Sequence, residues 1–119
     1  MIDAETLRMR LRGALKDALK GRDRESMSVC RSLLAALDNA EAAPVDVLPA
    51  AGAIEQSVVG VGAAEVARHP LTPEQVSAVV ATELVERQGA IDVLAGSFPR
   101  EAATLVREVA LIESLTATD

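Results

Sequence analysis

The sequence predicts an all-α domain. Apolar residues recur at three- and four-residue steps along four stretches of the chain, which is the period of an amphipathic helix. Capping residues, glycine or proline bound these stretches, and no alternating strand pattern reaches a comparable length. With 119 residues, half apolar and a quarter charged, the chain suits one domain over residues 1–119. We expect four helices, at about 4–20, 24–41, 73–95 and 99–116.

The first two helices follow from the residues at their ends. Asp3 is suited to the N-cap, and Ile2 before it can pack on Leu7 as a hydrophobic staple. Gly21 is expected to end the first helix in a left-handed conformation, and Asp23 is expected to cap the second. Because only two or so residues separate them, we expect the two helices to form an antiparallel hairpin. Their apolar faces comprise Leu7, Leu11, Ala14, Leu15, Ala18 and Leu19, followed by Met27, Cys30, Leu33, Leu34 and Leu37.

Residues 43–70 are expected to form a long irregular connector, much of it mobile, because proline and glycine interrupt it repeatedly. Residues 54–59 or 63–68 could each form a helical turn or two. The sequence Gly60-Val61-Gly62 has the spacing of a dinucleotide-binding loop. Glu65 occupies the third glycine position, however, and no flanking strands are available, so a flexible connector is the better interpretation.

The third helix has the clearest start in the sequence. Thr72 is suited to the N-cap, Pro73 to the first helical position, and Gln75 can complete a capping box. Leu71 can pack on Val76 across this first turn. The apolar stripe then comprises Val76, Val79, Val80, Leu84, Ile91 and Leu94.

The third helix is expected to end at Gly96, and Gly89 within it could allow a bend. Ser97 or Phe98 then caps the fourth helix, with Pro99 in its first turn. The expected buried face of this helix comprises Ala102, Leu105, Val106, Val109, Ile112 and Leu115.

The residues indicate no catalytic, metal or cofactor site. Cys30 lies on an apolar stripe, where a buried side chain is expected, and His69 precedes a proline at the end of the connector. The acidic residues lack metal-ligand spacing. The sequence predicts a cytoplasmic protein without a membrane span. It has one cysteine, no signal peptide with a basic region before an apolar one, and no long uncharged stretch.

Charge is distributed unevenly along the chain. Residues 1–40 hold eight Lys and Arg against six Asp and Glu, whereas residues 41–119 hold four against twelve. Such asymmetry is compatible with a nucleic-acid surface, although a solvated helix face also explains it. Four cations follow one another at four-residue steps on the first helix, and we name them the basic ridge: Arg8, Arg12, Lys16 and Lys20.

A second charged group is expected on the third helix. Glu83 and Arg87 are four residues apart and can form an ion pair. They flank the apolar stripe and are expected to approach Arg31 of the second helix. A structural ion cluster is the favoured interpretation over a ligand site.

The run from Leu15 to Glu41 combines a basic helix, an Arg-Asp turn and a second helix with an Arg before a leucine run. In this order of features the chain resembles the GatB/YqeY family. The segment from Leu71 to Arg87 resembles its third helix, and Ala95 to Leu115 its fourth. The positions that match the pattern are Asp23, Arg31, Asn39, Glu83 and Arg87. The connector is longer and richer in Gly and Ala than the family's usual link.

The resemblance implies a small helical protein linked to glutamine-dependent tRNA amidotransferases, and a family label of carbon-nitrogen ligase with glutamine as amido donor. The family's C-terminal module, which is shared with the amidotransferase B subunit and contacts tRNA there, would begin where this sequence stops. We therefore expect a module that is not catalytic alone, with tRNA or amidotransferase subunits as partners and the basic ridge as the contact. The alternatives are a protein–protein interaction module without a nucleic-acid role, in which a partner or a second copy covers exposed apolar surface, and an amidotransferase-type enzyme, which the residues do not support.

Overall fold

A computed structural model describes residues 1–42 and 69–118, and within these ranges the protein consists of four α-helices without strands. The all-α prediction is therefore confirmed. The helix bounds differ from the predicted ones by one residue at most. The helices are α1 (Ala4–Gly21), α2 (Arg24–Ala42), α5 (Pro73–Leu94) and α6 (Pro99–Thr116).

The expectations for residues 43–68 lie outside the described part of the chain. They concern the irregular connector, its two helical turns and the Gly60-Val61-Gly62 segment. Only the last two residues of the predicted connector are described, and there the His69 backbone N–H donates to the Glu41 carbonyl oxygen at 3.2 Å.

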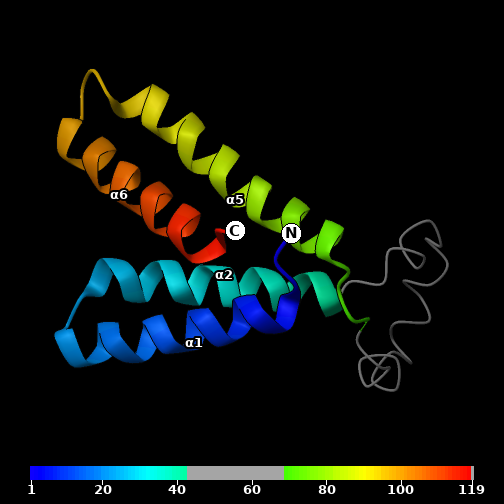
Figure 1. Cartoon of the computed structure of the whole chain (residues 1–119). Helices are drawn as coiled ribbons and strands as arrows, with labels where there is room; N and C mark the ends of the chain where they lie inside the picture. Colours follow the sequence, from blue (N-terminus) through cyan, green and yellow to red (C-terminus); the bar gives the residue numbers. More distant parts are fainter. Residues whose placement is uncertain (43–68, 119) are drawn as a thin grey trace, which may run out of the picture.

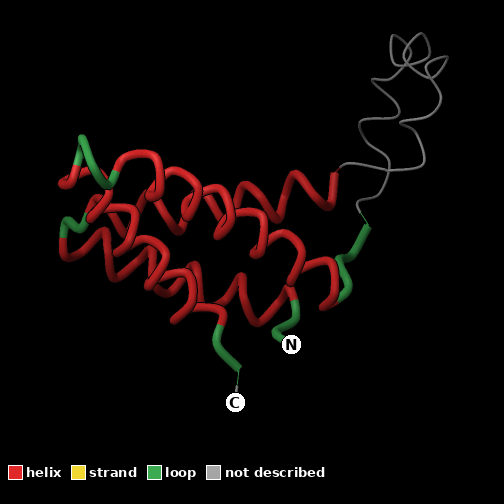
Figure 2. The backbone as a smooth tube through the Cα atoms, turned by 90° about the horizontal axis from the view of Figure 1, so that it is seen from above, coloured by secondary structure: helices red, strands yellow, loops and turns green. Residues whose placement is uncertain are grey.

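The helices are arranged as two pairs, α1 beside α2 and α5 beside α6 (Figure 1). α2 contacts both helices of the other pair, so it lies at the centre of the packing. α5 and α6 run obliquely to α1 and α2 in Figure 1, and in the view from above all the helices run broadly lengthwise across the molecule (Figure 2). The two chain ends lie near each other over the middle of the molecule in Figure 1, and both project from the same side of it in Figure 2.

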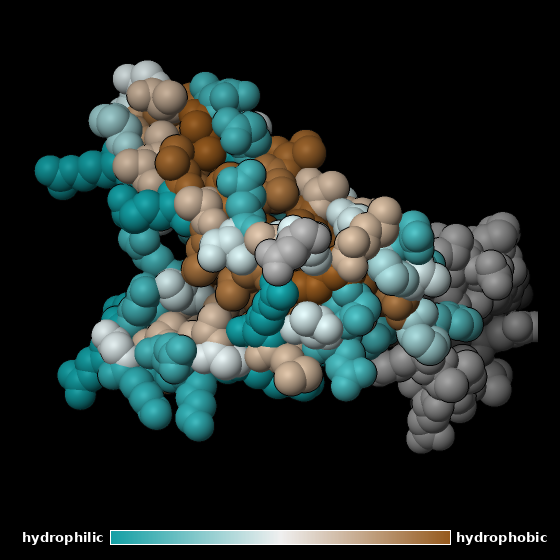
Figure 3. All heavy atoms as spheres, in the orientation of Figure 1, coloured by the Kyte–Doolittle hydropathy of each residue, from teal (hydrophilic) through white to brown (hydrophobic). Residues whose placement is uncertain are grey.

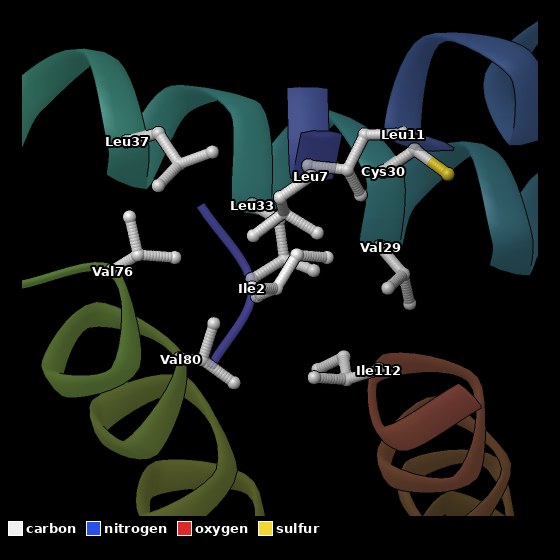
Figure 4. Packing of buried hydrophobic residues seen from close by; sticks show 10 residues of the cluster. All are labelled: Ile2, Leu7, Leu11, Val29, Cys30, Leu33, Leu37, Val76, Val80 and Ile112. Carbon is white, nitrogen blue, oxygen red and sulfur yellow. The ribbon is translucent and has the colours of Figure 1, made fainter. Parts of the chain in front are cut away.

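The core lies where the two pairs meet (Figure 4). Its largest fully buried side chains come from α1 and α2, with one each from α5 and α6. Ile2, just ahead of α1, lies between the α2 side chains and Val80 of α5. Burial of such side chains stabilises each by about 1.5–3 kcal/mol relative to exposure. The fully buried set is Leu7, Leu11, Val29, Cys30, Leu33, Leu37, Val76 and Ile112.

The predicted caps of α1 and α5 are confirmed. The Asp3 carboxylate accepts from the Thr6 backbone N–H at 2.7 Å. At α5, the Thr72 hydroxyl accepts from the Gln75 N–H at 3.1 Å, and the Gln75 side chain accepts from the Thr72 N–H at 2.9 Å. Each bond satisfies a backbone N–H that the first helical turn leaves free.

The end of α1 differs from the prediction. Gly21 remains helical, and Arg22 adopts the left-handed conformation at φ 56°. The Asp23 N–H then donates to the Ala18 carbonyl at 2.9 Å, which closes the helix end. The prediction was wrong because it placed the only local glycine at the left-handed position. The helix runs one residue further, so the following arginine takes that position.

Two residues assigned to buried faces are exposed. Leu19 of α1 is 51% exposed and Val106 of α6 is 52% exposed. Each belongs to an apolar pattern wider than the surface that the neighbouring helices cover, so residues at the edge of the pattern remain in contact with solvent.

α6 is tied to the first pair at its middle and at its end. At its middle, Arg107 forms two hydrogen bonds of 2.9 Å with the Glu25 carboxylate of α2. At its end, the Arg10 guanidinium of α1 donates to the carbonyls of Leu115 and Ala117, at 3.0 and 2.7 Å. A cation at a helix C-terminus is favourable because the last carbonyls there are unpaired and carry partial negative charge.

Candidate functional site

Three of the four cations of the basic ridge lie on the outer face of α1. Arg12, Lys16 and Lys20 are exposed, and none forms an ion pair with another described residue. The core-facing side of α1 is formed by Leu7, Leu11 and Ala18. Figure 3 shows hydrophilic side chains along the lower edge of the molecule, where Figure 1 places α1. Within the described part of the chain, no carboxylate pairs with this row of cations.

Arg8, the first residue of the predicted ridge, does not belong to this free surface. Its guanidinium pairs with the Asp38 carboxylate at 2.7 Å and with the Glu41 carboxylate at 2.6 Å, and its side chain is only 15% exposed. The ridge turns around the helix by about 40° at each four-residue step, so its first member faces α2 instead of solvent. The exposed part of the basic ridge therefore consists of Arg12, Lys16 and Lys20.

Glu83 and Arg87 form the predicted ion pair, at 2.9 Å. Arg87 also donates through Nε to the Glu108 carboxylate of α6 at 2.9 Å, and the Ser32 hydroxyl of α2 donates to Glu83 at 3.1 Å. Burial lowers the pKa of Arg87, but the hydrogen bonds to Glu83 and Glu108 outweigh this effect and the net pKa is raised. The guanidinium therefore stays charged and joins three helices, which is a structural role.

Arg31 does not take part in this cluster, contrary to the prediction. It is exposed on α2, beside Met27 and Ser28 in a shallow surface hollow. The next residue, Ser32, is rotated by about 100° around the helix and reaches Glu83 in its place.

The remaining positions of the family pattern are a cap and a surface residue. The Asp23 carboxylate accepts from the Ser26 hydroxyl at 2.6 Å and from its backbone N–H at 3.1 Å, so it caps α2 as predicted. These two bonds lower the pKa of Asp23. Asn39 is exposed near the end of α2. Asp23, Arg31 and Asn39 are thus spread along α2 and do not converge with Glu83 and Arg87.

The described residues offer little to a catalytic mechanism. Cys30 is fully buried, and burial raises the pKa of its thiol, which disfavours the reactive thiolate. His69 is exposed ahead of α5. Within residues 1–42 and 69–118, no group of three His, Cys, Asp or Glu side chains is placed to hold a metal ion. None of the described helices combines the length and apolarity needed to cross a membrane.

A surface that the sequence analysis missed lies on the second helix pair. Large apolar side chains are exposed on α5, on α6 and at the turn between them: Val85, Val93, Phe98 and Val106. Brown, apolar surface gathers over this half of the molecule in Figure 3. The signal that could have found it is that apolar residues occur on every side of α5, because one packed face cannot bury them all.

We compared the chain with known families, curated proteins and solved structures. No match is found.

Proposed function

We propose that this chain is a non-catalytic helical binding module of the GatB/YqeY type that associates with tRNA through α1. The observation that carries the proposal is the row of exposed cations Arg12, Lys16 and Lys20, which is without ion-pair partners among the described residues. Lys and Arg on one helix face can neutralise consecutive phosphates, and they release the counterions that surround a nucleic acid. The single aromatic residue, Phe98, argues against base stacking, so the contacts would be with the RNA backbone.

The proposed contact is weak and depends strongly on salt. The net charge of −6 opposes the approach of RNA at long range, so we expect dissociation constants in the micromolar range or weaker. Each phosphate contact contributes about 0.7–0.9 to the slope of log affinity against log salt, which predicts a slope magnitude of about 2–3 for three contacts.

The test is a salt titration of tRNA binding to the full chain by fluorescence anisotropy. The double variant Arg12→Ala/Lys16→Ala should bind more weakly and lower the slope magnitude by about 1.5. Arg24→Ala/Arg100→Ala is the matched control, because it removes the same charge from exposed positions on α2 and α6. An equal loss in both variants, or no tRNA binding at low salt, would refute the α1 contact.

A second candidate function is a protein–protein interaction module. The exposed valines of α5 favour it, since Val85 is 70% and Val93 80% exposed. Contiguous apolar surface on a soluble domain commonly marks a binding surface. The two candidates use different helices, so variants on α1 and α5 separate them.

A further inference from the structure

The outer face of α5 carries small and apolar side chains where a solvated helix normally carries charges. Residues 78, 81, 85, 89 and 93 are alanine, alanine, valine, glycine and valine, and all five are exposed. The opposite side of the helix packs into the core through Val76 and Val80. α5 therefore has apolar side chains on its inner and its outer face, but other helices cover only the inner face.

The charges around this outer face are of one sign. Glu74, Glu86 and Asp92 are exposed and form no ion pair with any other described residue. Arg87 is the only cation of α5, and its side chain is 13% exposed because it points to Glu83 and Glu108. The helix thus presents an apolar strip edged by carboxylates, with its positive charge turned inward.

Gly89 lies at the centre of this strip, and the fold itself gives no reason for a glycine there. A Cβ at this position would meet nothing within 4 Å, and the residue is helical without a positive φ. Glycine in the middle of a helix costs about 0.5–1 kcal/mol relative to alanine. Glycine allows another molecule to approach the helix backbone closely. No described residue of this chain makes such an approach at Gly89.

A second copy of the chain fits this face poorly. If two α5 helices crossed antiparallel at Gly89, Val85 would lie against Val93 of the other copy. Glu86 would then lie against Asp92 of that copy, on both sides of the crossing. Like charges placed together are destabilising, and each copy also carries a net charge of −6.

We propose that the outer face of α5 docks an amphipathic helix of a partner protein, whose apolar face is flanked by Lys and Arg. The partner's apolar residues lie against Val85, Gly89 and Val93, and its cations pair with Glu86 and Asp92. This inference rests on the second candidate function and is independent of RNA binding by α1. The 22 residues of α5 span about 33 Å, so one docked helix covers less than the roughly 800 Å² per partner of a standard interface, and we expect micromolar affinity.

The test uses a synthetic helical peptide of the length of α5, with a Leu and Ala face flanked by lysines. A second peptide has glutamate in place of every lysine. Binding to the full chain is measured by fluorescence anisotropy, and the contacted residues are mapped by NMR amide shifts. The basic peptide should bind about tenfold more tightly than the acidic one and shift the amides of α5 between Ala78 and Val93.

Two α5 variants and one control localise the contact. Val85→Lys should weaken binding of the basic peptide about tenfold, whereas Met9→Lys, at an exposed apolar position of α1, should leave it unchanged. Gly89→Leu should also weaken binding about tenfold while the chain remains folded, because the added side chain enters open space. Binding that is equal for both peptides, or insensitive to these two variants, overturns the proposal.

Sedimentation, peptide binding and the tRNA titration together separate docking of a partner helix on α5 from self-association and from RNA binding by α1. Sedimentation that shows a dimer weakened by Val85→Lys would assign the face to a second copy and overturn the proposed partner. A monomer that binds neither peptide at α5 would reject α5 as the docking surface, whereas the tRNA titration of the α1 variants would be unaffected.

Discussion

The two helix pairs use their apolar residues differently. α1 and α2 supply six of the eight largest fully buried side chains, and expose Met9 and Leu19, both on α1. α5 and α6 supply the other two, Val76 and Ile112, and expose Val85, Val93 and Val106. The first pair therefore supplies most of the large buried side chains, whereas the second buries fewer of its large apolar residues and exposes more of them.

The largest effect on the free energy of unfolding is expected when a buried residue of the first helix pair is compared with an exposed residue of the second. Leu33→Ala removes a fully buried side chain of α2 and should lower the free energy of unfolding by about 3 kcal/mol. Val85→Ala on α5 should change it by less than about 0.5 kcal/mol. Urea denaturation followed by circular dichroism measures both. A comparable loss in the two variants would remove the contrast between the pairs.

The ion cluster between the pairs should have the next largest effect. Arg87→Met leaves the mostly buried carboxylates of Glu83 and Glu108 together without a cation, and should lower the free energy of unfolding by about 2 kcal/mol. Arg107→Met removes an arginine from an exposed pair and should have a much smaller effect. Equal losses in these two denaturation curves would contradict a structural role specific to Arg87.

A smaller effect, of opposite sign, is expected on the outer face of α5. Gly89→Ala should raise the free energy of unfolding by about 0.5–1 kcal/mol, because alanine favours the helix and its Cβ meets no neighbour. Thermal denaturation should show a higher midpoint. A lower midpoint would mean that the fold itself needs the glycine, and would remove one support for a docked partner.

The smallest effect concerns pH and the start of α2. Hydrogen bonds from Ser26 lower the pKa of Asp23 below 3.8, the value taken for an unperturbed Asp, so the folded state favours the ionised form. The stabilisation is therefore complete above that value and is lost as the pH falls through the lower pKa of the folded state. Asp23→Asn retains a capping side chain without this titration.

We expect the difference in thermal midpoint between the wild type and Asp23→Asn to shrink as the pH falls below about 4. Circular dichroism melts over this pH range measure the difference. A difference that stays constant with pH would show that the carboxylate gives α2 no pH-dependent support.

Local signals in the sequence were enough to predict the helices and three of their caps. Asp3, Asp23 and Thr72 each bond to a backbone group three residues away, so the geometry of one helical turn determines them. Arg8 faces α2 because it pairs with Asp38 and Glu41. Both are remote from it in the sequence, and no local pattern indicates that pairing. Which residue of α2 contacts Glu83, Ser32 or Arg31, likewise depends on how α2 is rotated against α5.

Of the two candidate surfaces, the sequence predicted the cations of α1 but not the apolar face of α5. The reason is again that packing between helices decides which residues are exposed. Arg12, Lys16 and Lys20 stand beside a clear apolar stripe, so their outward direction follows from the helical period. α5 has apolar residues on every side, and the sequence alone does not indicate which of its valines face inward. Val76 and Val85 are both ordinary members of the pattern, and only the packing of α2 buries one and leaves the other exposed.

The position of Ile112 in the core has a consequence for synthesis on the ribosome. Ile112 packs in the same cluster as Leu33, yet it is translated about seventy residues after α2 ends, which at roughly 5–20 residues per second is a delay of about 4–14 s. Through that interval the nascent first helix pair lacks the side chain that closes its core. A chaperone that binds apolar segments would have its opportunity in this period, before α6 emerges.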